Sequence, residues 1–155
     1  MKIEDILSED LVLADLQARM KPEVLVELAD ALTTRHQELG LDKARLVGAL
    51  EDRERLNSTA LGDGVAIPHG KLPGLKRVFA AFGRSRAGVD FQSLDGKPTH
   101  LFFLLVAPDE SAGAHLKALA RISRLLKDAG FRSRLLDAPD AHALWTTIRD
   151  EDARY

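Results

Sequence analysis

Apolar positions recur with the period of an α-helix in the first third of the chain. The segment 21–39 places a stripe of them on one helical face (Val24, Leu25, Leu28 and Leu32). Gly40 is suited to end this helix, because glycine readily adopts the left-handed conformation found after helices. Asp42 can then cap a second helix that runs through Arg55, with Leu46, Val47 and Leu50 as its apolar side.

The middle of the chain changes to patterns typical of strands. Segment 77–82 is strand-like, segment 88–91 is consistent with a short edge strand, and Asp95-Gly96 predicts a turn. The run 101–106 is apolar at every position, which indicates a strand buried on both faces. Leu11-Val12-Leu13 adds a further candidate strand.

Helical patterns return near the end, over 111–127 and then in shorter pieces from Phe131 and Asp140. Helices that alternate with strands predict an α/β fold in which helices flank a β-sheet. Several connections are too short for a wholly parallel sheet, so we expect a mixed sheet. The length of 155 residues and the lack of any linker or repeat predict a single domain over residues 1–155.

Composition removes several classes of function. The chain has 45% hydrophobic and 30% charged residues and a net charge of -2, which argues against a general nucleic-acid binder. It has no cysteine, so disulfides, thiolate catalysis and cysteine-ligated metals are excluded. The N-terminus lacks the apolar core of a signal peptide, and the longest apolar run, 101–107, is too short to span a bilayer. We therefore expect a cytoplasmic protein with no membrane segment.

The segment 56–71 concentrates small and turn-forming residues around one histidine. His69 stands between Pro68 and Gly70, directly after the apolar step Val65-Ala66-Ile67. The proline pushes Ile67 toward an extended conformation, and the glycine permits the backbone to turn away. His69 is thus expected at the exit of a short strand. It is either a reactive group held by a restricted backbone or simply the exposed residue of a common type of turn.

A longer motif runs through this segment, consisting of Ser58-Thr59, Gly62-x-Gly64 and Ala66-Ile67-Pro68-His69-Gly70. It resembles the signature of the phosphotransferase-system IIA domains of the fructose/mannitol type, most of all their nitrogen-regulatory branch. Further matches are Arg53-Glu54, Phe91-x-x-Leu94-Asp95-Gly96-Lys97-Pro98, the strand-like run 101–108 and His115-Leu116. The likeness spans residues 53–126 in register. The family usually has glycine in place of Asn57 and Ala60, and Ala60 would be unfavourable if its position required a positive φ.

The resemblance implies both a fold and an activity. The fold is a mixed β-sheet flanked by helices, in agreement with the pattern of elements. The activity is that of a phosphocarrier: His69 would accept a phosphoryl group from an HPr-like carrier, itself charged from phosphoenolpyruvate through enzyme I. A neutral imidazole is a competent nucleophile because its pKa is ordinarily about 6.5. Phosphorylation would then regulate partner proteins, and an apolar collar with a polar rim is expected around the loop.

The small residues before His69 suit such a reaction. Ser58, Thr59, Gly62 and Gly64 can bring hydroxyl and backbone N–H groups close to phosphoryl oxygens, as other glycine-rich loops do. We therefore expect these four residues to form a phosphoryl-binding loop.

His115 is the second candidate. It shares a helical face with apolar residues at spacings of four, three and four (Leu119, Ile122 and Leu126). On spacing alone it is a half-buried histidine at the end of a hydrophobic stripe. The first turn of a helix also favours anions, and the family carries a second histidine at the matching place. The resemblance therefore implies a role in assisting His69.

Arg53 is the third candidate, since a forked guanidinium suits phosphoryl oxygens. The run Asp52-Arg53-Glu54-Arg55 is also what a solvated helix surface looks like. The match of Arg53 to an arginine in the family pattern favours a role in stabilising the phosphoryl group.

Other chemistry finds no support in the sequence. No pair of histidines has the local spacing of a zinc site, and there is neither a P-loop nor a dinucleotide fingerprint, so no metal and no cofactor are expected. His36, His100 and His142 are interpreted as incidental. A hydrolase with His69 as general base lacks a recognisable serine, cysteine or carboxylate partner.

Two other functions stay open at this stage. One is a sugar-specific IIA domain of the fructose or mannitol type, which passes its phosphoryl group to a IIB partner. The other is an interaction module that retains the loop and is never phosphorylated.

Overall fold

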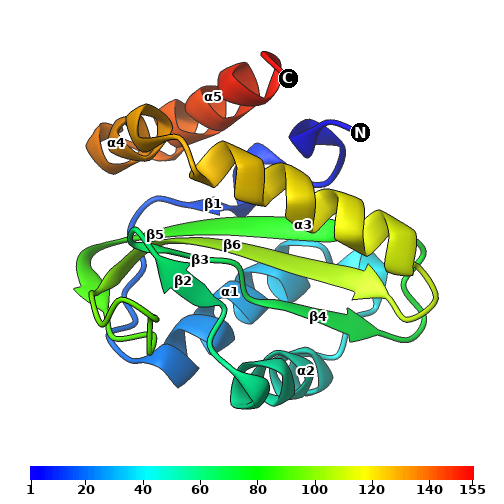
Figure 1. The fold of residues 1–155 in the computed structure, drawn as a ribbon. Helices are drawn as coiled ribbons and strands as arrows, with labels where there is room; N and C mark the ends of the chain where they lie inside the picture. The colour runs from blue at the N-terminus through cyan, green and yellow to red at the C-terminus, as the bar shows by residue number, and fades with distance from the viewer.

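The computed structural model describes the backbone of residues 1–155 and every side chain except that of Ala112. Over this range the chain forms a mixed six-stranded sheet (Figure 1). The strands, in the order in which they lie across the sheet, are β1 (Val12–Leu13), β5 (Phe79–Val89), β6 (Thr99–Pro108), β3 (Val65–Ala66) and β2 (Ala60–Gly62), and β4 (His69–Leu72) also pairs with β6. Parallel and antiparallel pairs both occur, so the expected mixed sheet is confirmed.

Helices cover both faces of the sheet. They are α1 (Lys21–Arg35), α2 (Lys43–Leu56), α3 (Ala112–Leu126), α4 (Ala129–Asp137) and α5 (Ala141–Asp152). Helices α1 and α2 lie on one face, α3 lies on the other, and α4 and α5 continue on the side of α3 (Figure 1). Short 3₁₀ turns occur at Ile3–Asp5, Glu9–Leu11 and Gln37–Leu39. None of the helices in the described part of the chain is both long and apolar enough to cross a membrane.

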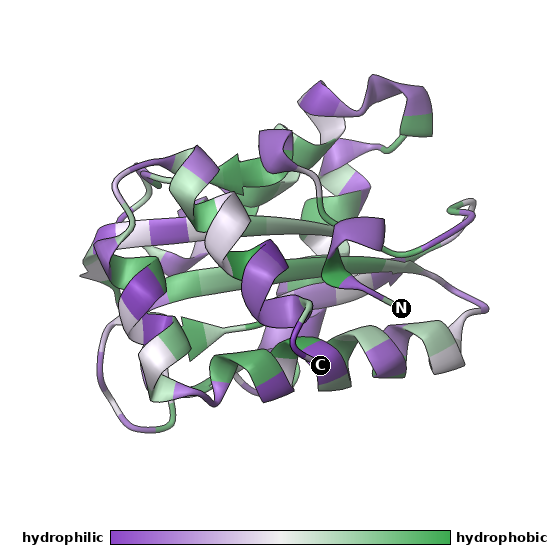
Figure 2. Cartoon of the chain, turned by 90° about the horizontal axis from the view of Figure 1, so that it is seen from above, coloured by the Kyte–Doolittle hydropathy of each residue, from purple (hydrophilic) through white to green (hydrophobic). Residues whose placement is uncertain are grey.

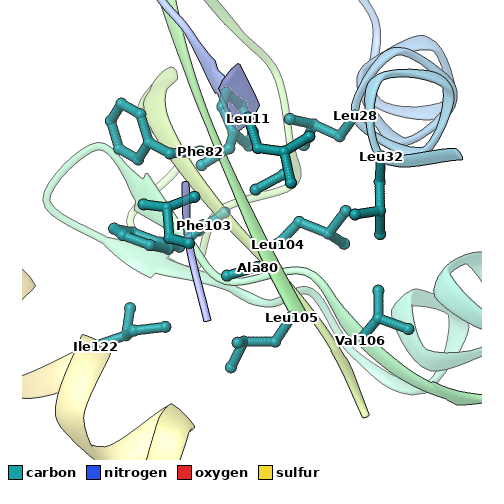
Figure 3. Packing of buried hydrophobic residues seen from close by; sticks show 14 of the residues in the cluster. Leu11, Leu28, Leu32, Ala80, Phe82, Phe103, Leu104, Leu105, Val106 and Ile122 are labelled. Carbon is teal, nitrogen blue, oxygen red and sulfur yellow. The ribbon is translucent and has the colours of Figure 1, made fainter. Parts of the chain in front are cut away.

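The antiparallel pair β5–β6 forms the centre of the molecule. Residues 101–107 of β6 are buried throughout, as their unbroken apolar run predicts. Successive side chains point to opposite faces, so Leu105 lies on the side of Ile122 of α3 whereas Leu104 lies toward Leu28 and Leu32 of α1 (Figure 3). The strands are accordingly the most uniformly apolar elements, and the helices alternate apolar and polar stretches (Figure 2).

Most predicted elements are present, with three corrections. The first helix ends at Arg35 and not at Leu39, because His36 leaves the helical conformation and a 3₁₀ turn follows. Segment 88–91 is not a separate edge strand: β5 runs without interruption to Val89, in the interior of the sheet. The turn that was expected after His69 is absent there, because His69 begins strand β4 (His69–Leu72).

Candidate functional site

His69 is the first residue of β4 and pairs with Leu105 at the centre of β6. Pro68 accepts a hydrogen bond from the Leu105 amide at 2.9 Å, so the strand pairing begins just before the histidine. Gly70 does not turn the chain. A Cβ atom there would lie 3.4 Å from the Cβ of Ala49, so glycine lets β4 pack closely against α2. This contact brings the end of α2 next to His69.

The two nitrogens of the His69 ring have different partners. Nδ1 lies 2.8 Å from the carbonyl oxygen of Ile67, and Nε2 accepts from Nε of Arg53 at 3.3 Å. A carbonyl oxygen only accepts, so Nδ1 carries the proton. Nε2 therefore carries the lone pair of the ring.

The environment keeps this ring neutral. Partial burial lowers the pKa of His69 and the positive charge of Arg53 lowers it further, against the opposing effects of the Ile67 carbonyl and of Glu54. A pKa below the ordinary value means that the lone pair on Nε2 is available at neutral pH.

Arg53 is held by the end of its own helix. Its Nη1 donates to both the backbone carbonyl and the side-chain oxygen of Asn57, each at 3.0 Å. This leaves Nε directed at His69 and fixes a positive charge beside Nε2. The alternative interpretation of this part of α2 as a simple solvated surface does not fit Arg53, which is half-buried.

His115 lies next to His69, with their ring centroids 5.3 Å apart and the planes tilted by 52°. It is 5% exposed at the start of α3, and Nδ1 has no hydrogen-bond partner among the described residues. Burial lowers the pKa of His115 to about 4, and the charges of His69 and Lys71 act in the same direction. His115 is thus a neutral ring at the edge of the site.

The hydroxyl groups of Ser58 and Thr59 are already engaged within the protein. Ser58 donates to the carbonyl of Phe91 at 2.7 Å, and both the amide and the hydroxyl of Thr59 donate to the buried carboxylate of Glu54. Glu54 also pairs with Nζ of Lys21 at 3.0 Å. These bonds tie the loop to α2 and to the first residue of α1, so the hydroxyls hold the loop in shape.

Gly62 and Gly64 lie in the turn between β2 and β3. Both have positive φ, as has Asp63 between them, and the Asp63 amide donates to the carboxylate of Asp95 at 3.2 Å. The Gly64 carbonyl accepts from the amides of His100 and Leu101. The contacts of these glycines thus shape the hairpin. Ala60 has an ordinary strand conformation, so its replacement of a glycine causes no strain.

Sequence reasoning missed three residues that organise the site. Glu54 and Lys21 form the buried ion pair behind the loop, and Asn57 orients Arg53. Glu54 and Asn57 could have been suspected from their places next to Arg53 and Ser58. Lys21 is far away in sequence, and no local pattern points to it.

The fold of this chain also occurs in known structures. The crystal structure of nitrogen regulatory protein IIA-Ntr from Neisseria meningitidis superposes with a TM-score of 0.87, at 33% identity, over 94% of this chain and 98% of that one. Mannitol IIA from Escherichia coli, at 20% identity, shares the fold with a TM-score of 0.75 over 91% of this chain and 97% of its own. The molecule is therefore a phosphotransferase-system IIA domain.

The chain belongs to the EIIA 2 family of the phosphoenolpyruvate-dependent sugar phosphotransferase system, whose sequence model matches residues 5–151. A nitrogen regulatory protein of Bradyrhizobium diazoefficiens is 42% identical over 149 residues, which cover 96% of this chain and 95% of the relative. The fructose-specific EIIABC component of Bacillus subtilis is 36% identical over 152 residues, which are 98% of this chain but 24% of that protein.

Proposed function

We propose that the chain is a cytoplasmic phosphocarrier that accepts a phosphoryl group on Nε2 of His69 from a phosphohistidine of an HPr-like carrier. The observation that carries this proposal is the bonding of the His69 ring. The Ile67 carbonyl binds the proton on Nδ1, and the lone pair of Nε2 meets the guanidinium of Arg53.

The transfer balances without any proton leaving His69. The lone pair of Nε2 forms the new N–P bond while the P–N bond to the donor histidine breaks, and its electron pair stays on the donor ring. The product ring carries a proton on Nδ1, which the Ile67 carbonyl binds, and the phosphoryl group on Nε2. Arg53, released from Nε2, can donate to the phosphoryl oxygens, where charge builds up during the transfer.

His115 is suited to assist the phosphorylation of His69 and not to become phosphorylated itself. A neutral imidazole offers one N–H to a phosphoryl oxygen, and its burial restricts access of a donor protein. Ser58 and Thr59, with Gly62 and Gly64, would act by holding the loop against α2 and β6, because the two hydroxyls have protein partners.

Exposed leucines close in sequence to the site residues suit a protein donor. Four come from segments next to site residues, and each leaves more than half of its surface exposed (Leu56 79%, Leu61 69%, Leu94 74% and Leu116 64%). Unpaired apolar surface beside a reactive group is typical of a docking area. This collar would be covered by the carrier during transfer.

A regulatory role fits the full-length match to nitrogen regulatory proteins. A phosphoryl group adds roughly one to two negative charges at neutral pH. This added charge would change which proteins bind the leucine collar. In this proposal the phosphorylation state of His69 is the signal, and the partner proteins that respond to it lie downstream.

The test is the intact mass of the protein after incubation with phosphoenolpyruvate, enzyme I and an HPr-type carrier. We expect a gain of one acid-labile phosphoryl group in the wild type, none in His69→Ala, and a slowed gain in His115→Ala. His142→Ala is the matched control, because His142 is an exposed histidine far along the chain in α5, and it should behave as the wild type. An unmodified wild-type protein with every carrier tried would contradict the proposal and leave an interaction module.

One observation favours a second function, namely the 36% identity to a fructose-specific EIIABC component. A sugar-specific domain would pass its phosphoryl group on to a IIB partner. The loaded protein should therefore be mixed with the IIB domain of a fructose system. Loss of the label from His69 to IIB would favour sugar uptake, whereas retention of the label favours the regulatory function.

A further inference from the structure

Arg84 is an arginine in the interior of the molecule. It is fully buried on β5, and it binds backbone carbonyls at the end of α4. Its Nε donates to the carbonyl of Ala14 at 3.1 Å, and its Nη1 donates to the carbonyls of Leu135 at 2.9 Å and Ala138 at 2.5 Å. Nη2 has no hydrogen-bond partner among the described residues.

These carbonyl groups satisfy hydrogen bonds but do not neutralise the charge. A buried cation is strongly unfavourable unless an anion or further hydrogen bonds compensate for its lost hydration. Asp15, the carboxylate in the neighbourhood, pairs with Arg86 at 2.9 Å. Burial accordingly lowers the pKa of Arg84, the charge of Arg86 adds to this effect, and the charge of Asp15 opposes it. The region therefore has an excess of positive charge.

A hollow opens at this point. It is lined by Arg84, Arg86, His100 and Leu136 and has a volume of about 240 Å³, with no carboxylate among the described residues that line it. Nδ1 of His100 lies 2.8 Å from the carbonyl of Ser85 and so carries the proton. This leaves Nε2 of His100 to accept a hydrogen bond, for example from the P–OH group of hydrogen phosphate.

We propose that this hollow binds a small oxyanion, the phosphate or carboxylate group of a metabolite. Two guanidinium groups match the planar pairs of oxygen atoms of such groups, and Leu136 provides an apolar wall for the carbon part of the ligand. The proposed ligand compensates the buried charge of Arg84.

The hollow is separate from the phosphoryl-acceptor site. His69 pairs with Leu105, which is five residues from His100 along β6. With a rise of about 3.3 Å per residue, the two sites are roughly 16 Å apart along the strand. The proposal therefore does not depend on the phosphorylation of His69.

The test is a titration of the protein with inorganic phosphate and, in a second arm, with succinate, each against sodium chloride of equal ionic strength. Binding is followed by the NMR signals of the arginine Nε–H groups and of His100. We expect saturable shifts of Arg84, Arg86 and His100 in at least one arm, and the arm that produces them identifies the anionic group.

Variants at the rim of the hollow provide the decisive comparison. Arg86→Gln should weaken binding about ten-fold in the arm that shows binding, the effect of one lost charge-assisted hydrogen bond, and His100→Gln should do the same for phosphate, whose P–OH group donates to Nε2. Arg55→Gln is the matched control, since it also removes an exposed arginine that pairs with a carboxylate. These variants avoid Arg84 itself, whose replacement can unfold the protein.

Two results would overturn the proposal. One is the absence of saturable shifts in both arms. The other is binding that survives in Arg86→Gln and His100→Gln but disappears in Arg53→Gln, because the anion would then occupy the His69 site.

Discussion

Each nitrogen of the His69 ring is bonded to a different segment of the chain. The Ile67 carbonyl, two residues away, binds Nδ1, and Arg53 at the end of α2 binds Nε2. Pro68 holds Ile67 in an extended conformation, so the restricted backbone around His69 determines which ring nitrogen carries the proton and which carries the lone pair. The effects of Arg53 and His115 can be separated in experiments, because Arg53 carries a positive charge and His115 is neutral.

Replacement of Arg53 by lysine should slow the phosphorylation of His69 by about a hundred-fold, the usual effect of losing one donor that stabilises developing charge. Lysine keeps the charge, but one ammonium group cannot bind Asn57 and reach Nε2 in the way the guanidinium does. The rate of phosphoryl transfer from the loaded carrier, followed by rapid quench, provides the measurement. Arg55→Lys, two residues further along α2, should transfer at the wild-type rate; equal rates for both variants would rule out this role of Arg53.

The two histidines should also make the folded state sensitive to acid. The folded protein holds the pKa of His115 at about 4 and lowers that of His69, whereas both rings in the unfolded chain take up protons near pH 6.5. Between these values the unfolded state binds more protons, so the free energy of unfolding falls as the pH is lowered. Urea denaturation at about pH 7 and about pH 4.5 should show a decrease about 2 kcal/mol smaller in His115→Gln than in the wild type. Equal decreases would show that His115 is protonated in the folded protein.

At the scale of elements, the strands with charged residues were the hardest to predict. The apolar pattern of β5 is interrupted by Arg84 and Arg86. The sequence pattern therefore predicted two short strands where the structure has one continuous strand. Arg84 is compatible with the interior because carbonyls from Ala14, Leu135 and Ala138 bind it. Those residues are distant in sequence, so a local pattern cannot reveal them. The helices and β6 depend on local periodicity and were predicted to within a few residues, the end of α1 excepted.

The site shows the same division between local and distant information. His69, His115 and Arg53 were predicted and do lie together. The structural role of Glu54 could not be predicted from its run of charged residues, because its partners, Thr59 and Lys21, lie outside α2. The hydroxyls of Ser58 and Thr59 were expected to face a phosphoryl group, but the structure shows them bonded within the protein.

Helix α2 presents Arg53 to His69 and Glu54 to the loop, since neighbouring positions on a helix point in different directions. Glu54→Ala should lower the free energy of unfolding by about 3 kcal/mol, because it leaves Lys21 and the Thr59 groups without their buried partner. Urea denaturation provides the value. Glu51→Ala, about one turn earlier and only partly exposed, should cost less than about 1 kcal/mol. Similar losses for the two variants would mean that the Lys21–Glu54 pair contributes little.

At the scale of the whole molecule, the two ends of the chain are joined by one carboxylate. Asp152 is buried at the end of α5, accepts from the backbone amide of Ile3 at 2.6 Å and pairs with Arg121 of α3. Helix α5 thus connects the first turn of the chain to the helix that carries His115.

Replacement of Asp152 by alanine should lower the free energy of unfolding by about 3 kcal/mol, because a buried arginine contact and a backbone amide lose their partner. Thermal or urea unfolding provides the measurement. Asp150→Ala, an exposed position on the same helix, should change the free energy of unfolding by less than about 0.5 kcal/mol. If both variants lower the free energy of unfolding by the same amount, the contact between the two ends of the chain does not stabilise the protein.

The join between Ile3 and Asp152 also bears on the order of events in folding. The two residues are 149 positions apart, and closing so long a loop costs roughly 4 kcal/mol of chain entropy before the contact repays it. We expect such a contact to form after the sheet has assembled, so its loss should leave the refolding rate nearly unchanged. Stopped-flow kinetics of Asp152→Ala should then show faster unfolding alone, and a matching decrease in the refolding rate would place the contact in the transition state. The join would thus determine how long the native molecule persists, with little influence on how quickly it is reached.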